Sequence, residues 1–195
     1  MEKGGLSAEL EEVGCSGVAG LYWGDEMRVG LIGQVRRVWA PRGTKVVQVV
    51  EYKREWAYLN LAVNGLTGEL RWDWTTNMKG ESIAPVVTQW ADEGVDTVVW
   101  DRARGHRGAA YQDVTVKLVE QPPYSPELNP AERVFEYLRS KIEGRVYGTI
   151  GAKKQAVEVE LRELSANPEK VISLAGWDWI RHSVSGLWDI STAFG

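Results

Sequence analysis

The chain has 195 residues, 44% of them hydrophobic and 26% charged, which is enough for one domain with a complete core. One cysteine excludes an internal disulfide framework, and with only two histidines beside it the composition argues against a structural zinc site. The formal net charge of −4 argues against a chain that wraps nucleic acid by itself, and no stretch has the unbroken apolar length of a membrane span.

The first half of the chain is predicted to be rich in strands. Residues 17–26 are expected to form a first strand that ends at its two acidic residues. Residues 44–52 are β-branched and are interpreted as a strand or an arm. Residues 55–76 alternate around a turn containing Asn, Thr and Gly, which predicts a hairpin. Apolar residues at helical spacing predict a helix over residues 79–93.

The second half is predicted to alternate strands and helices. A nearly all-apolar run at 95–101 is typical of a strand buried on both faces, and residues 114–120 form another strand. Helices are expected near Ala109 and over 130–143, 151–165 and 168–174, with irregular structure after the last. This order of elements predicts an α/β fold, a mixed sheet with helices on both faces.

Three acidic residues fall at expected strand ends and at a helix start, namely Asp25, Asp101 and Glu132. Sites in open α/β sheets lie at strand ends, and carboxylates are the ligands that magnesium prefers, so the pattern fits a site for metal-assisted phosphodiester chemistry. Structural interpretations remain open. Asp25 and Asp101 suit turns or helix caps, and the run from Asn129 to Glu132 reads as a capping box with Pro130 at the first helical position.

The ten tryptophans also have two interpretations. Most can belong to the core or to sheet faces, or some can form a stacking platform for sugars or bases. A tryptophan-rich carbohydrate-binding module would be all-β, and the helical second half argues against it.

Residues 121–142, QPPYSPELNPAERVFEYLRSKI, place four prolines in ten residues directly before a helical pattern. The prolines fix φ and remove backbone donors, so the segment cannot join the sheet, and Asn129 with Pro130 starts the helix at one place. The string PPYSPELNPAE resembles the signature segment of DDE-superfamily endonucleases. These are the transposases of bacterial insertion sequences related to the mariner group (the six-thirty family of insertion sequences).

Other segments resemble the same family in the same order. VVWDRARGH is similar to its strand that ends in the second Asp, with Ala103 and His106 following Asp101. GDEMRVGL is similar to its first acidic strand end, RRVWAPRGT to its Trp-x-x-x-Gly segment, and LNLAVNGLTGEL to its hairpin turn. Together these matches run from about residue 20 to 145.

The resemblance implies an RNase H-like fold with a mixed five-stranded sheet. It makes Asp25, Asp101 and Glu132 the catalytic and metal-binding triad, holding Mg²⁺ or Mn²⁺ as two ions for DNA cleavage and strand transfer in transposition. Supporting or substrate-binding roles are implied for Glu26, Arg102, His106, Tyr124 and Asn129. The implied partners are double-stranded DNA of transposon ends and target, a separate N-terminal helix-turn-helix module or reading frame, and a homodimer on DNA. The implied location is the bacterial cytoplasm, at the nucleoid when bound to DNA, without membrane contact.

The chain departs from the family pattern at two places. Arg102 stands where asparagine is common, and it is expected either to pair with the neighbouring acid or to reach a phosphate. We expect no helix-turn-helix module in the short segment before the first strand. We expect a polar leader at 1–16, a catalytic domain at 17–166 and a C-terminal tail with a short helix at 167–195. The alternative function is a non-catalytic relic or split-frame fragment that binds DNA or a partner without cutting.

Overall fold

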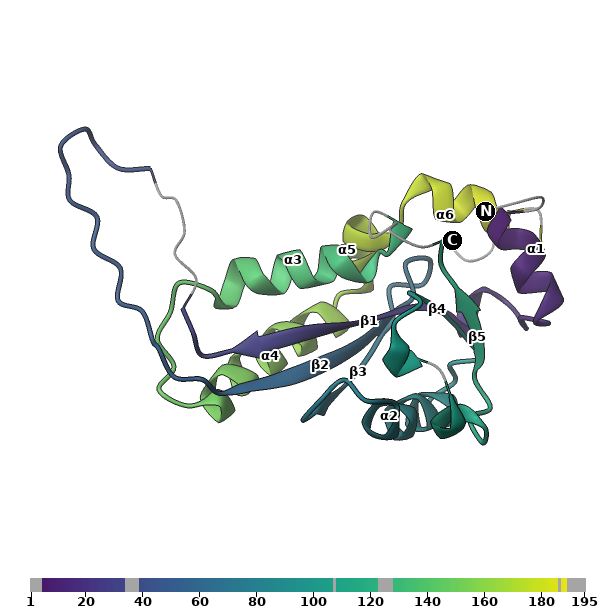
Figure 1. Cartoon of the computed structure of the whole chain (residues 1–195). Coiled ribbons are helices and arrows are strands. Elements are labelled where there is room, and N and C mark those ends of the chain that lie inside the picture. Colours follow the sequence, from purple (N-terminus) through teal and green to yellow (C-terminus); the bar gives the residue numbers. More distant parts are fainter. Residues whose placement is uncertain (1–4, 34–38, 107, 123–127, 186, 189–195) are drawn as a thin grey trace.

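A mixed five-stranded sheet forms the centre of the molecule (Figure 1). The computed structural model describes residues 5–33, 39–106, 108–122, 128–185 and 187–188. The strands are β1 (Leu21–Gly30), β2 (Trp56–Val63), β3 (Leu70–Thr75), β4 (Thr97–Trp100) and β5 (Lys117–Glu120), in the order β3-β2-β1-β4-β5. β1, β2 and β3 are antiparallel, whereas β4 is parallel to both β1 and β5. The predicted mixed sheet is therefore confirmed.

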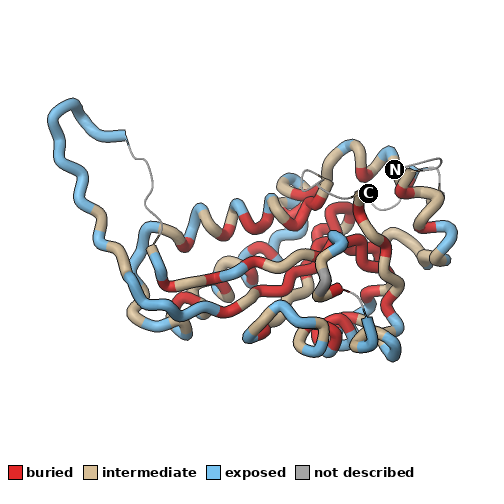
Figure 2. The backbone as a smooth tube through the Cα atoms, viewed as in Figure 1, coloured by how far each residue is buried: buried red, intermediate tan, exposed pale blue. Residues whose placement is uncertain are grey.

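Helices cover both faces of this sheet, as the sequence predicts. They are α1 (Gly5–Glu12), α2 (Gly80–Asp92), α3 (Ala131–Ile142), α4 (Ile150–Ser165), α5 (Pro168–Ala175) and α6 (Asp178–Val184). The buried side chains of α2 pack in one cluster with Tyr22 and Val98. The remaining helices share a larger cluster on the other face, around Trp23 and Phe135. Figure 2 shows the buried residues concentrated along the strands and the inner sides of these helices.

The turn of the β2–β3 hairpin is built by side-chain capping and by one glycine. Asn64 Oδ1 accepts hydrogen bonds from the backbone N–H groups of Leu66 and Thr67, at 3.0 and 3.1 Å. Gly68 has φ of 78°, a left-handed conformation that favours glycine. A Cβ atom at Gly68 would also collide with the carbonyl group of Pro168, at the start of α5. The predicted hairpin is confirmed, and its turn also contacts α5.

An exposed arm leaves the body of the molecule between β1 and β2 (Figures 1 and 2). Its described part, residues 39–55, forms neither helix nor strand, so of the two interpretations of 44–52 the arm is correct and the strand is wrong. Its exposed apolar side chains are Trp39, Val46, Val47, Val49 and Tyr52. At the base of the arm, the Glu51 carboxylate accepts hydrogen bonds from the N–H groups of Tyr147 and Gly148. These bonds attach the arm to the α3–α4 loop.

Both ends of the described chain pack against the core more than the sequence predicts. Leu6 and Leu10 of α1 are buried, and the Ser7 hydroxyl donates a hydrogen bond to the carbonyl of Ser183 in α6. The expected irregular structure after α5 is wrong, because α6 buries Ile180 in the same core. The division at 1–16, 17–166 and 167–195 stays a prediction. Among the described residues, every helix is too short or too polar to cross a membrane.

Candidate active site

Asp25 lies in the middle of β1, not at its end as the sequence predicts, because the antiparallel pairing with β2 extends the strand to Gly30. The pairing of β1 with β4 is short, however. β1 pairs with β4 only from Leu21 to Trp23, and β4 ends at Trp100. Continuing that parallel register aligns Asp25 with Asp101. The two acids therefore lie beyond the carboxyl end of the β4 ladder, where sites of α/β sheets are found.

Asn129 connects the start of α3 to Asp25. Its Oδ1 accepts a hydrogen bond from the N–H of Ala131, at 3.1 Å, which caps the helix as the sequence predicts. Its Nδ2 donates to the carbonyl of Gly24 at 3.0 Å and to Asp25 Oδ2 at 3.2 Å. The Asn129 side chain therefore both caps α3 and holds the carboxylate of Asp25. This gives a physical reason for a rigid proline segment directly before α3.

The Asp25 carboxyl has a strongly raised pKa of about 7. Burial is the largest cause, and the negative charges of Glu26, Glu132 and Asp101 add to it. The N–H of Glu26 donates to Asp25 Oδ1 at 2.8 Å and acts in the opposite direction. The negative charges of the other two predicted triad members therefore act on the Asp25 carboxyl.

Asp25→Asn is expected to flatten the pH dependence of stability. The folded pKa of Asp25 lies above the unfolded value, so this carboxyl contributes stability below pH 4 that is lost as pH rises to about 7. In metal-free buffer, urea unfolding should show the variant more stable than wild type at pH 8, by about 4 kcal/mol for a pKa raised by roughly three units. At pH 4 the two proteins should agree. A constant difference across this range would contradict the assignment.

His106 lies between two acidic side chains, those of Glu26 and Asp101, and contacts both. Its Nε2 lies 2.9 Å from Glu26 Oε1, and its Nδ1 lies 2.9 Å from Asp101 Oδ1. Its ring stacks on Trp100 with 4.0 Å between centroids. The His106 side chain is 2% exposed and that of Glu26 is 4% exposed, whereas that of Asp101 is 59% exposed.

The hydrogen bonds of His106 also set its charge state. Burial lowers its pKa, but the hydrogen bond and charge of Glu26, together with Asp101, outweigh burial and raise it. Both ring nitrogens face oxygen atoms that accept hydrogen bonds, which favours the doubly protonated ring. Tyr111 contacts Trp100 edge-on and donates to the carbonyl of Gly105 at 2.8 Å. Sequence analysis missed Trp100 and Tyr111 as parts of the site, and their aromatic character alone gave no signal for it.

Glu132 lies in the first turn of α3, as predicted. The capping box is only half formed, because the Glu132 carboxylate lies 3.5 Å from Arg139 Nη1 at the surface. Arg102 pairs with Glu120 and not with its neighbour Asp101, and its predicted contact with a phosphate stays a prediction. Its Nε lies 3.3 Å from Glu120 Oε2 and donates to the carbonyl of Gln121. Tyr124 is outside the described residues.

The donor set has the chemistry of a magnesium or manganese site, since Asp25, Asp101 and Glu132 all offer carboxylate oxygens. The pKa of Asp25 is raised first by burial and then by the neighbouring acids, and a bound divalent cation would favour the charged carboxylate. In the described ranges, however, no three His, Cys, Asp or Glu side chains are close enough together to hold an ion. Glu132 faces Arg139 and would have to turn toward Asp25 to complete the set.

Sheet order and helix placement together define an RNase H-like fold that matches the cores of transposases. The sequence model described as DDE superfamily endonuclease matches residues 20–151, so this chain belongs to that family. No curated protein sequence matches the chain significantly.

Solved structures of Mos1 transposase share the fold. A paired-end complex with the left transposon end has a TM-score of 0.55 at 12% identity, over 86% of this chain and 58% of that one. The mariner Mos1 paired-end complexes with Mn and with Mg have TM-scores of 0.54, at 13% and 14% identity. They cover 88% and 87% of this chain, and 60% and 59% of theirs. The chain thus spans less than two thirds of these proteins.

Proposed function

We propose that this chain is the catalytic core of a DNA transposase that cleaves phosphodiester bonds and transfers DNA strands with Mg²⁺ or Mn²⁺. The observation that carries the proposal is the position of its acids. Asp25 lies in β1 and Asp101 directly follows the neighbouring parallel strand β4, and Glu132 lies in the first turn of α3. Membership of the DDE endonuclease family and likeness to the Mos1 fold support the same function.

Asp25, Asp101 and Glu132 would hold the ions. Bound ions would supply activation of the attacking oxygen and stabilisation of the leaving oxygen. The protein's own groups position these acids. Asn129 holds Asp25 Oδ2, and two N–H donors hold one oxygen of Asp101. Such fixed placement of charged groups is what phosphoryl-transfer chemistry requires of a protein.

The proposed substrate is double-stranded DNA, at transposon ends and at a target. The Mos1 structures include complexes with a transposon end and a strand transfer complex, and we extend DNA binding to this chain by likeness of fold. A dimer on DNA and a separate helix-turn-helix module or reading frame belong to the same proposal. So does an origin in a bacterial insertion sequence of the six-thirty family.

The test is nicking of supercoiled plasmid by the purified wild-type chain. We expect relaxed plasmid to accumulate with Mg²⁺ or Mn²⁺ and to stay at background with EDTA. Ca²⁺, which binds carboxylates with looser geometry, serves as the control for binding without cutting. If the folded protein binds Mn²⁺ but leaves the plasmid and linear transposon-end DNA intact in every metal, the catalytic proposal is wrong.

A further inference from the structure

The Asp101 carboxylate is held by only one of its two oxygens. Oδ1 accepts a hydrogen bond from the N–H of Ala103 at 2.9 Å and faces His106 Nδ1, also at 2.9 Å. Oδ2 has no hydrogen-bond partner in the part of the chain that the structure describes. Two donors on one oxygen fix the direction in which the other oxygen points, although the side chain is mostly exposed.

His106 can fix Asp101 because its own ring is immobilised on three sides. Trp100 lies against its face, with ring planes only 7° apart. Both carboxylate oxygens of Glu26 lie within 3.0 Å of Nε2. The Asp101 carbonyl lies 3.1 Å from Nδ1, so backbone and side chain of Asp101 meet the same nitrogen. Ring rotation would break all of these contacts together.

Glu26 and Asp25 are neighbours in β1 but point to opposite faces of the sheet. Asp25 shares a face with Trp23 and the α3 side of the core, whereas Glu26 shares a face with Tyr22 and the α2 side. Glu26 is nearly fully buried, and both of its oxygens are used by His106. Its position therefore suits it to hold the histidine and not to bind an ion beside Asp25.

We propose that His106, held by Glu26 and Trp100, is a positioning residue that directs Asp101 Oδ2 toward a bound divalent cation. This inference rests on the proposed function, because it needs Asp101 to be a metal ligand. Glu26 acts through His106 only. Partners that orient a metal ligand in this way change metal affinity by about 10–100-fold when they are removed.

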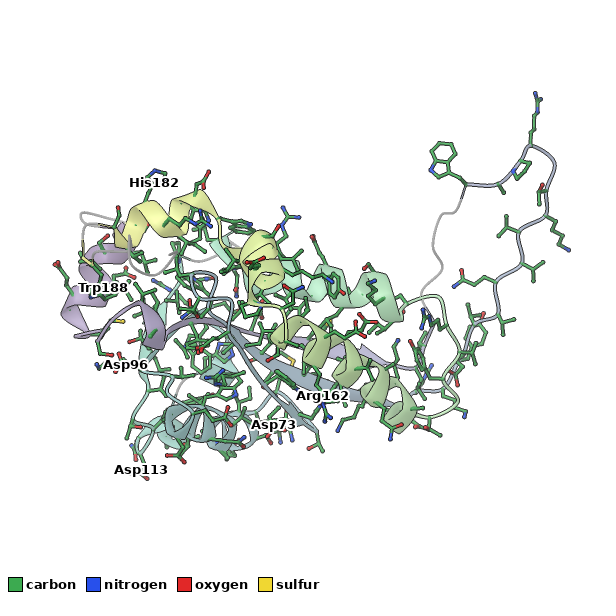
Figure 3. The ribbon with its side chains drawn as sticks, turned by 180° about the vertical axis from the view of Figure 1, so that it is seen from behind. Asp73, Asp96, Asp113, Arg162, His182 and Trp188 are labelled. Carbon is green, nitrogen blue, oxygen red and sulfur yellow. The ribbon has the colours of Figure 1, made fainter. Side chains whose placement is uncertain are left out.

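Two amide variants of His106 separate its two hydrogen bonds. The side-chain nitrogen of Asn lies near the position of Nδ1, and that of Gln lies near the position of Nε2. His106→Asn thus keeps a donor toward Asp101, whereas His106→Gln keeps only the donor toward Glu26. Each variant loses the imidazole ring and its stacking on Trp100, so loss of folding stability affects both. His182, exposed on α6 and labelled in Figure 3, gives the control His182→Asn.

The readout is Mn²⁺ affinity, measured by the electron paramagnetic resonance signal of the free ion, with plasmid nicking at saturating Mn²⁺ as the second readout. We expect His106→Gln to weaken Mn²⁺ binding by about 10–100-fold, and His106→Asn, which keeps the donor toward Asp101 but loses the contact with Glu26, to weaken it clearly less. His182→Asn should match wild type. Equal affinities for the two His106 variants would overturn the positioning role.

A double-variant cycle tests whether Glu26 acts through His106. Glu26→Ala should weaken Mn²⁺ binding, and adding it to His106→Gln should cause no further loss. Additive losses would make Glu26 a ligand in its own right and overturn the proposal. Failure of the proposed function looks different, because wild type would then leave DNA intact in every metal whatever its Mn²⁺ affinity, and a wild type that binds no Mn²⁺ would overturn both proposals.

Discussion

Replacing Asp101 with asparagine is expected to reduce metal-dependent nicking at least about 100-fold, the scale on which loss of one charge-stabilising group acts. Glu132→Gln should cause a loss of the same order. Both substitutions preserve size and remove the negative charge that holds a divalent cation. The initial rate of plasmid relaxation in Mg²⁺ measures the effect, and far-ultraviolet circular dichroism verifies that the variants are folded.

Each of these substitutions has a matched control in the same region. Glu136 lies one turn after Glu132 in α3, with a side chain that is 59% exposed and paired with Arg133. Asp113, labelled in Figure 3, is exposed in the segment before β5. Glu136→Gln and Asp113→Asn should nick at wild-type rates. Nicking that survives Asp101→Asn and Glu132→Gln would show that the acids are not the catalytic ligands.

Lys153→Met is expected to destabilise the protein by about 3–5 kcal/mol, because it leaves a buried carboxylate without its cation. The Lys153 side chain is 3% exposed, and that of its partner Glu143 is 10% exposed. Lys153 Nζ lies 3.0 Å from Glu143 Oε1 and donates to the carbonyl of Gly30 at 2.8 Å. This one side chain therefore joins α4 to the ends of β1 and α3. Urea unfolding at pH 7 measures the loss.

The double variant Lys153→Met with Glu143→Met should recover most of that stability, because an apolar pair of similar volume removes both charges together. The surface control is Arg162 (labelled in Figure 3), which is 75% exposed on α4 and lies 3.6 Å from Glu158. Arg162→Ala should change stability by less than about 1 kcal/mol. If Lys153→Met is equally mild, the ion pair contributes little.

The sequence predicts the main elements because their patterns are local. The apolar spacing of α2, α3 and α4 and the alternation of β2 and β3 are visible without tertiary information. The β-branched run at 44–52 shows the limit of such reasoning, since strand propensity depends on a neighbouring strand that the fold does not supply. Leu6 and Leu10 carry helical spacing, but a helix of eight residues needs tertiary packing to be stable.

The sequence predicts which acidic residues belong to the candidate site, but it does not predict the contacts that hold their side chains. Asp25 lies at the site because β4 is short, and nothing near Asp25 in the sequence shows where that neighbouring strand ends. Strand alternation does place Glu26 on the opposite face, yet its contact with His106 joins residues 80 apart in the chain. Lys153 shares the spacing of Val157, Leu161 and Leu164, which was a signal for a buried lysine.

The exposed arm, residues 39–55, is a place where the chain can be cut into two fragments. β1 and β2 are held together by a ladder of eight residue pairs, while the segment that joins them lies outside the body and is exposed at Arg42 and Lys45. Trypsin cleavage there would leave two fragments associated through the centre of the sheet. The first fragment carries Asp25 and the second carries Asp101 and Glu132, so the complete set of acids exists only when the fragments combine. If the two fragments are expressed separately, the site forms only when they bind each other, so assembly of the site can be measured as a binding equilibrium.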